Sequence, residues 1–270
     1  MAIFQLVDSQ RGVLIIANDA DTRSARNIAL LCQEHSHIFR IFTENPIDSA
    51  WRGIQNHVFN NIDDTTSFSA HIVVDCNLTV HEEAEYLTLI DEQSNSTIIS
   101  LSPSMTSAAL ARIYGSVDVV RINLLSGFFP KMQTVEFAPA LQMSEEHKYQ
   151  VVHFLESVGL HIEEIQDVVG FITPRIVAML ANEAAFAVME ATATVSDIDA
   201  AMKLGTNYPL GPLQWADEIG IDVVVAILDA LFAEYHQERY RVCRLLRQYM
   251  NVGLLGKSVG AGFYSYNSGM

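Results

Sequence analysis

The residues that could bind a metal or act as nucleophiles are scattered along this 270-residue chain. The three cysteines, Cys32, Cys76 and Cys243, lie far apart, and none forms a CxxC motif or pairs with histidine at metal-ligand spacing. Cysteine-containing zinc sites and disulfide frameworks use close, repeated spacings. We therefore expect no bound metal and no disulfide, but buried free thiols in a reducing cytoplasm.

The charge balance narrows the classes of partner. The formal net charge is −16, which argues against nucleic acid, because phosphates are bound by lysine and arginine. An anionic cofactor would need a local basic or amide-rich pocket that overrides this field. Apolar runs such as 13–17 and 223–228 are far shorter than the roughly 20 residues of a membrane helix. Asp8 and Arg11 interrupt the N-terminal apolar run, so we expect no targeting segment, no membrane contact and a cytoplasmic protein.

The first half of the chain alternates short apolar strands with helical segments. The predicted strands are residues 13–17, 38–42, 72–75, 97–100 and 119–125, and the helices between the later strands are 82–90 and 107–114. Such alternation indicates βαβ units and a parallel, doubly wound sheet. A helix at 144–158 and a strand at 161–165 complete this α/β half.

From Thr173 onward the pattern is helix after helix. Residues 175–193 are apolar nearly all round and rich in alanine, which predicts a helix buried on several sides and a place for it at a subunit interface. Ser196 followed by Asp199 is a capping-box pattern that would open the next helix. Two further helices are predicted at 222–235 and 240–250.

Short motifs in this second half keep their order and spacing over about a hundred residues. They are Gly170-Phe171-Ile172, Asn182-Glu183-Ala184, the segments 196–205 and 208–212, 217–222, and the closing segment 256–266. In these motifs the chain resembles the 3-hydroxyacyl-CoA dehydrogenase family. The resemblance implies a Rossmann-like domain over residues 1–168 and an all-α dimerisation domain over residues 169–270. It also implies a homodimer through the C-terminal helices, an acyl-CoA-like small molecule as ligand, and a place in fatty-acid metabolism.

The family binds NAD at a glycine-rich turn after the first strand, where backbone amides approach the pyrophosphate. Here Val13–Ile16 runs into residues 17–22, which contain no glycine. Asp19 and Asp21 would repel the phosphates, and capping the following helix is the better interpretation. The acidic residue that the family uses at the end of the second strand to hold the ribose hydroxyls corresponds to Glu44.

The family's catalytic base is a histidine, which a glutamate twelve residues later orients and charges. With Pro130, Met132 and Val135 as anchors, Leu124 takes the histidine position and Glu136 is the retained glutamate. A leucine cannot accept a proton. His71, like the other histidines, has no spacing that places it beside Glu136, and an isolated histidine is usually structural or exposed.

Two substrate contacts of the family also differ. Pro174 replaces the asparagine of the family's Gly-Phe-Ile-Val-Asn-Arg segment, and it has no amide to hold the substrate carbonyl. The family's serine turn falls near Pro103, so Ser102 or Ser104 could substitute only with a shift of register.

The favoured hypothesis is a family member that keeps the fold and dimer but has lost dehydrogenation, and that serves in ligand binding or as a partner. No cofactor is expected on this interpretation. The alternative is an active NAD(P)-dependent oxidoreductase on 3-hydroxyacyl-CoA or a related hydroxy acid, with NAD as cofactor. A third interpretation is a non-redox enzyme that uses Glu136 as acid or base.

Overall fold

The computed structural model describes residues 12–18, 22–47, 49–64, 68–93, 95–125 and 134–266. The chain divides into two compact units. The first holds the described residues up to 102, then 107–122 and 134–167. The second holds 103–106, 123–125 and 168–266 of the described residues. The short segments 103–106 and 123–125 thus belong with the helical unit, although they follow strands of the first.

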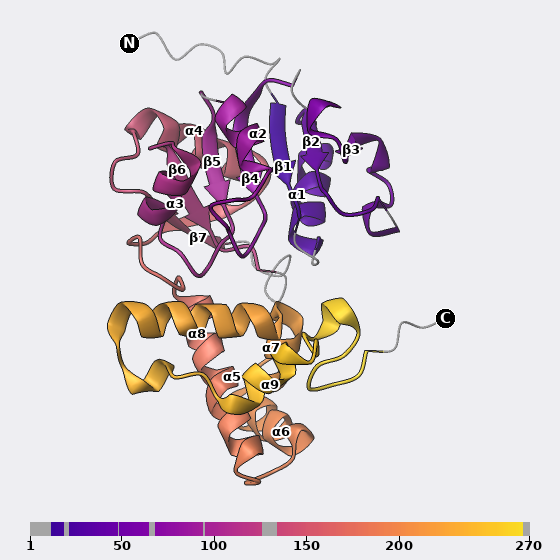
Figure 1. Ribbon diagram of the computed structural model, residues 1–270, viewed down its shortest axis with the longest axis vertical. Helices are drawn as coiled ribbons and strands as arrows, with labels where there is room; N and C mark the ends of the chain where they lie inside the picture. Colours follow the sequence, from indigo (N-terminus) through magenta and orange to yellow (C-terminus); the bar gives the residue numbers. More distant parts are fainter. Residues whose placement is uncertain are drawn as a thin grey trace. The chain divides into compact units, whose positions relative to one another are not determined.

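The first unit is built on a sheet whose eight described strands run in the order β3-β2-β1-β4-β5-β6-β7-β8 (Figure 1). The strands are β1 (Gly12–Ile16), β2 (Phe39–Phe42), β3 (Val58–Phe59), β4 (Ala70–Asp75), β5 (Thr97–Ser100), β6 (Val119–Ile122), β7 (Thr134–Pro139) and β8 (His161–Glu164). All neighbours pair in parallel except β6 and β7, where Ile122 lies opposite Phe137 in an antiparallel pair. This confirms the Rossmann-like α/β class, but two strands, β7 and β8, run antiparallel to the other six.

Four helices of the first unit lie between its strands. They are α1 (Arg23–Glu34), α2 (Leu87–Glu92), α3 (Ser107–Tyr114) and α4 (Glu145–Ser157). The central strands are mostly apolar and, apart from the half-buried His71, buried along their length, as strands covered on both faces are. Two predicted boundaries were wrong. The strand expected to reach residue 125 ends at Ile122, and the helix expected from residue 82 begins at Leu87, because turns over 82–86 deliver the buried Tyr86 to the sheet.

The second unit is helical among its described residues. Its helices are α5 (Thr173–Met189), α6 (Val195–Thr206), α7 (Pro212–Ile219), α8 (Ile221–Tyr235) and α9 (Arg244–Asn251). Helix α5 packs against α7, α8 and α9 of the same chain, which accounts for the alanines that it buries. Pro174 lies in its first turn, where the missing N–H costs no helical hydrogen bond.

The predicted cap of α6 was wrong. Thr194, not Ser196, is the N-cap: its hydroxyl oxygen accepts from Asp197 N, at 3.3 Å, and its O–H donates to the Asp197 carboxylate. Asp199 is buried and serves another helix, since its two oxygens accept from Leu213 N and Gln214 N at the start of α7, both at 2.9 Å. The same carboxylate accepts from the Tyr264 hydroxyl at 2.8 Å.

Asp217 ties the closing segment to α7. Its carboxylate accepts from the backbone of Phe263 and Tyr264, each at 2.9 Å, and from the Tyr266 hydroxyl at 3.1 Å. Burial of this fully enclosed group raises its pKa above the usual value, while those donors act in the opposite direction. The motif residues Asp199 and Asp217 are therefore packing and capping residues. Within the part of the chain that the structure describes, no helix is both long and apolar enough to cross a membrane.

Candidate functional site

The carboxyl ends of the parallel strands define the place where a ligand would bind in this fold. Strand β1 lies between β2 and β4, and the chain crosses from one side of β1 to the other between β3 and β4. In open α/β sheets the binding crevice lies at this switch point, outside the strand ends. The residues that follow β1, β2 and β4 here are Asn18, Glu44 and Asn77.

Asn18 joins these three strand ends by hydrogen bonds from all of its polar groups. Its backbone N–H donates to Asn77 Oδ1 at 2.8 Å, and its carbonyl accepts from Asn45 Nδ2 at 2.9 Å. Its side chain pairs with Glu44 in both directions: Nδ2 donates to Glu44 Oε1 and Oδ1 accepts from Glu44 N, each at 2.9 Å. We call Asn18, Glu44 and Asn77 with these bonds the asparagine clasp. The backbone N–H of Asn18, in the turn that would face a pyrophosphate, is thus bonded within the protein.

The buried carboxylate of Asp75 holds Asn77, and thereby the asparagine clasp, in place. Asp75, the fully buried last residue of β4, accepts from Asn77 Nδ2 at 2.7 Å and from Asn77 N at 3.0 Å through Oδ1. Its other oxygen accepts from the hydroxyls of Tyr114, at 2.6 Å, and Tyr86, at 3.3 Å. Burial, followed by the nearby negative charge of Asp75, raises the pKa of Tyr114 well above its usual value. Tyr114 therefore stays a hydrogen-bond donor at any physiological pH.

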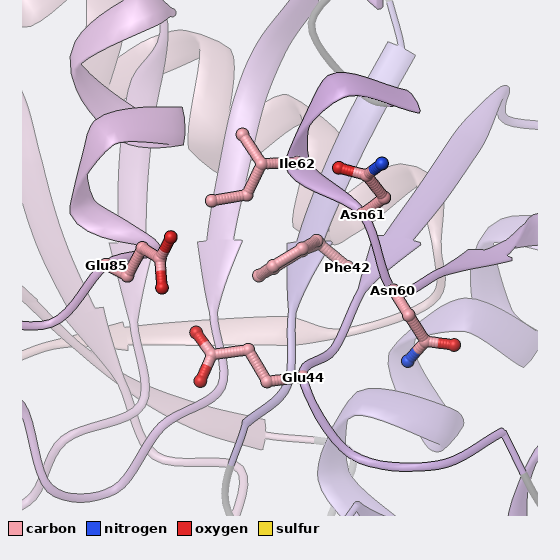
Figure 2. A pocket seen from close by; sticks show the side chains of 6 residues that line it. All are labelled: Phe42, Glu44, Asn60, Asn61, Ile62 and Glu85. Carbon is pink, nitrogen blue, oxygen red and sulfur yellow. The ribbon is translucent and has the colours of Figure 1, made fainter.

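A pocket opens beside the clasp. It is lined by Phe42, Glu44, Asn60, Asn61, Ile62 and Glu85. Figure 2 shows the carboxylates of Glu44 and Glu85 directed toward the same space, next to Phe42 and Ile62. Asn60 braces the rim, since its Nδ2 donates to the carbonyls of Thr43 and Asn45, both at 2.7 Å. The predicted ribose-binding residue Glu44 thus lies at a pocket, but its Oε1 already accepts a hydrogen bond from Asn18 Nδ2.

Glu136 lies on β7, well away from this pocket, and is 8% exposed. Five strand spacings of about 4.8 Å separate β2 from β7, so Glu44 and Glu136 are roughly 24 Å apart across the sheet. Glu136 leaves the sheet on the same face as Arg121, because Arg121 pairs with Ala138, two residues further along β7. It interacts electrostatically with that buried guanidinium.

Arg121 itself has a structural role. It is fully buried, and it donates to the Asp167 carboxylate at 2.9 Å and to the Ser107 hydroxyl at 3.3 Å. Burial lowers its pKa, and the charges of Asp167 and Glu136 act against that shift. Asp167 also accepts from Ser107 N and Ala108 N, at 2.7 and 2.9 Å, which caps α3. The hydrogen bonds among Arg121, Ser107 and Asp167 hold together β6, α3 and the segment that follows β8.

The two serine candidates fall in different units. Ser102 is fully buried, and its hydroxyl donates to the Leu78 carbonyl at 3.0 Å, so it is engaged inside the first unit. Ser104 belongs to the second unit and is partly exposed. Leu124 is buried, with 2% of its surface exposed. Asp19, Asp21 and the alignment anchors Pro130 and Met132 lie outside the described residues.

Comparison with known proteins fits the motifs of the second unit. A sequence model of the 3-hydroxyacyl-CoA dehydrogenase C-terminal domain matches residues 170–266. Through these residues the second unit is identified as the C-terminal domain of the 3-hydroxyacyl-CoA dehydrogenase family. The resemblance found in the sequence is thereby confirmed.

Relatives within the family carry dehydrogenase names. The chain is 41% identical over 137 residues to a probable 3-hydroxybutyryl-CoA dehydrogenase of Bacillus subtilis, a match over 51% of this chain and 48% of that protein. It is 31% identical over 182 residues to a 3-hydroxybutyryl-CoA dehydrogenase of Clostridioides difficile, over 66% of this chain and 64% of that protein. The matched part spans about half the length of the first relatives.

A solved structure extends the likeness of fold over nearly the whole chain. The (S)-3-hydroxybutyryl-CoA dehydrogenase of Ralstonia eutropha aligns with a TM-score of 0.74 at 23% identity. The alignment covers 96% of this chain and 99% of that structure. At this identity the likeness shows the fold, which is the Rossmann-like and helical arrangement described above.

At the start of the turn after β1, the described residues differ from a glycine-rich dinucleotide site. The pyrophosphate needs free backbone amides beside glycines, whereas Ala17 and Asn18 carry side chains and the Asn18 N–H is bonded to Asn77. Sequence reasoning missed Asn18 and Asn77, which look like ordinary turn residues, and Asp75, which ends a predicted strand. The available signal was that polar residues follow three neighbouring strands at one edge of the sheet.

Proposed function

We propose that this protein keeps the fold of the 3-hydroxyacyl-CoA dehydrogenase family without its dehydrogenation reaction, and that it acts by binding a ligand or a partner. The observation that carries the proposal is the asparagine clasp. The Asn18 N–H, Nδ2 and Oδ1, at the start of the turn that would hold the pyrophosphate, already make hydrogen bonds to Asn77 and Glu44. A pyrophosphate bound to the Asn18 N–H would have to replace the bond from that N–H to Asn77.

The position of the base supports the same proposal. Alignment with the family motif assigns the proton acceptor to Leu124, a buried apolar residue. A general base contributes about a hundredfold to ten-thousandfold in rate. Glu136 is retained, but Arg121 is the charged group with which it interacts, and Arg121 is held by Asp167 and Ser107. Leu124 follows β6 and the hydrogen-bonded Asn18 follows β1, so the two changes are separate in the fold and affect different steps.

Within this proposal the protein is a homodimer through its helical unit. Helix α5 buries much of its apolar surface against other helices of the chain, but Ile176 and Met189 keep 53% and 37% of their surface exposed. Ile172, directly before the helix, is 51% exposed. Leu204 of α6 is 88% exposed. Light scattering coupled to gel filtration should give the mass of a dimer, and Leu204→Glu should shift it toward monomer. A monomeric mass for the unaltered chain contradicts this part of the proposal.

The test of the proposal is a steady-state assay of acetoacetyl-CoA reduction by NADH or NADPH. We expect no turnover above the rate without protein, from a preparation whose fold is verified by circular dichroism. Glu136→Gln is the matched variant, since it keeps the side chain's shape and removes its charge. Turnover that Glu136→Gln abolishes would support the oxidoreductase interpretation, which the names of the relatives favour.

A further inference from the structure

We draw no further inference here: the strongest candidate, the cluster of exposed arginines at the start of α9 (Arg239, Arg241, Arg244 and Arg247), carries none, because Glu238 and Asp229 already pair with two of them and nothing in the structure shows what covers the others.

Discussion

Substitution of Asn77 by alanine should destabilise the first unit substantially, because the side chain makes one buried and one partly buried hydrogen bond. One is a bond from Nδ2 to the fully buried Asp75 carboxylate at 2.7 Å, and bonds to charged groups contribute about 1.5–3 kcal/mol. The other is the neutral bond from Asn18 N to Oδ1 at 2.8 Å, with about 0.5–1.5 kcal/mol. The backbone bond from Asn77 N to Asp75 persists. We therefore expect a loss of about 2–4.5 kcal/mol in the free energy of unfolding.

The two tryptophans allow this loss to be measured in the first unit alone. Trp51 is buried in the first unit and Trp215 in the second, so a Trp215→Phe background leaves Trp51 as the fluorescent reporter. Urea unfolding of Asn77→Ala is compared with that of Asn95→Ala, an exposed residue of the same unit whose side chain makes no hydrogen bond within the described residues. Asn95→Ala should change stability by less than about 0.5 kcal/mol. An Asn77→Ala chain as stable as this control would refute the anchoring role of Asp75 and Asn77.

Three further predictions concern packing and titration. A methyl group at Gly211 would overlap the Asp199 carboxylate, so Gly211→Ala should lower the free energy of unfolding by about 2–4 kcal/mol. Urea unfolding followed by Trp215 fluorescence measures this loss. The control Gly205→Ala, in open space on α6, should not lower the free energy of unfolding. The described cysteines are buried, and burial raises the pKa of Cys32 to about 12, so a thiol reagent at pH 8 should label the folded chain slowly and the urea-unfolded chain at all three sites; fast labelling of folded protein would be inconsistent with this. Burial, followed by the charges of two other histidines, lowers the pKa of His37 below 6.5, so its neutral form contributes stability above pH 6.5 that is lost as pH falls through the lowered folded pKa. Between pH 7 and pH 5 the His37→Gln variant should therefore lose less stability in urea unfolding than the unaltered chain. Equal losses of stability would count against the lowered pKa.

Much of the fold could be predicted because its strands are continuous apolar runs. Segments such as 72–75 and 97–100 have no polar face, and only a sheet covered on both sides buries them fully. The helix predicted from residue 82 failed for a tertiary reason. Tyr86 is drawn into the sheet by its bond to Asp75, and the residues before it turn to deliver it. No local pattern contains that information.

The caps show how two local patterns can compete. Thr194 with Asp197 and Ser196 with Asp199 both match the spacing of a capping box. The second pair does not form a capping box, because the Asp199 carboxylate accepts a hydrogen bond from Leu213 N at the start of α7, fourteen residues later. The asparagine clasp was missed for a similar reason. Its bonds join residues 26 and 59 positions apart, and only the strand order brings them together.

The assignment of Leu124 to the family's histidine position rests on residue type and alignment alone, and it stays a prediction. The electrostatic interaction of Glu136 with Arg121 could not be predicted from the sequence, since Arg121 comes from a neighbouring strand. The prediction that Glu44 holds ribose hydroxyls stays a prediction. The structure places Glu44 at a pocket, and its bonds to Asn18 supply a structural role that the sequence did not indicate.

The central claim is that this protein does not bind a nicotinamide nucleotide, and calorimetric titration with NADH and NADPH tests it most directly. The titrations are made with and without acetoacetyl-CoA, on protein whose two tryptophans report a folded state, and absorbance at the nicotinamide band is followed in parallel. The account predicts no binding of either nucleotide and no loss of absorbance. Binding at micromolar affinity, followed by loss of the nicotinamide absorbance, would contradict it and restore the dehydrogenase.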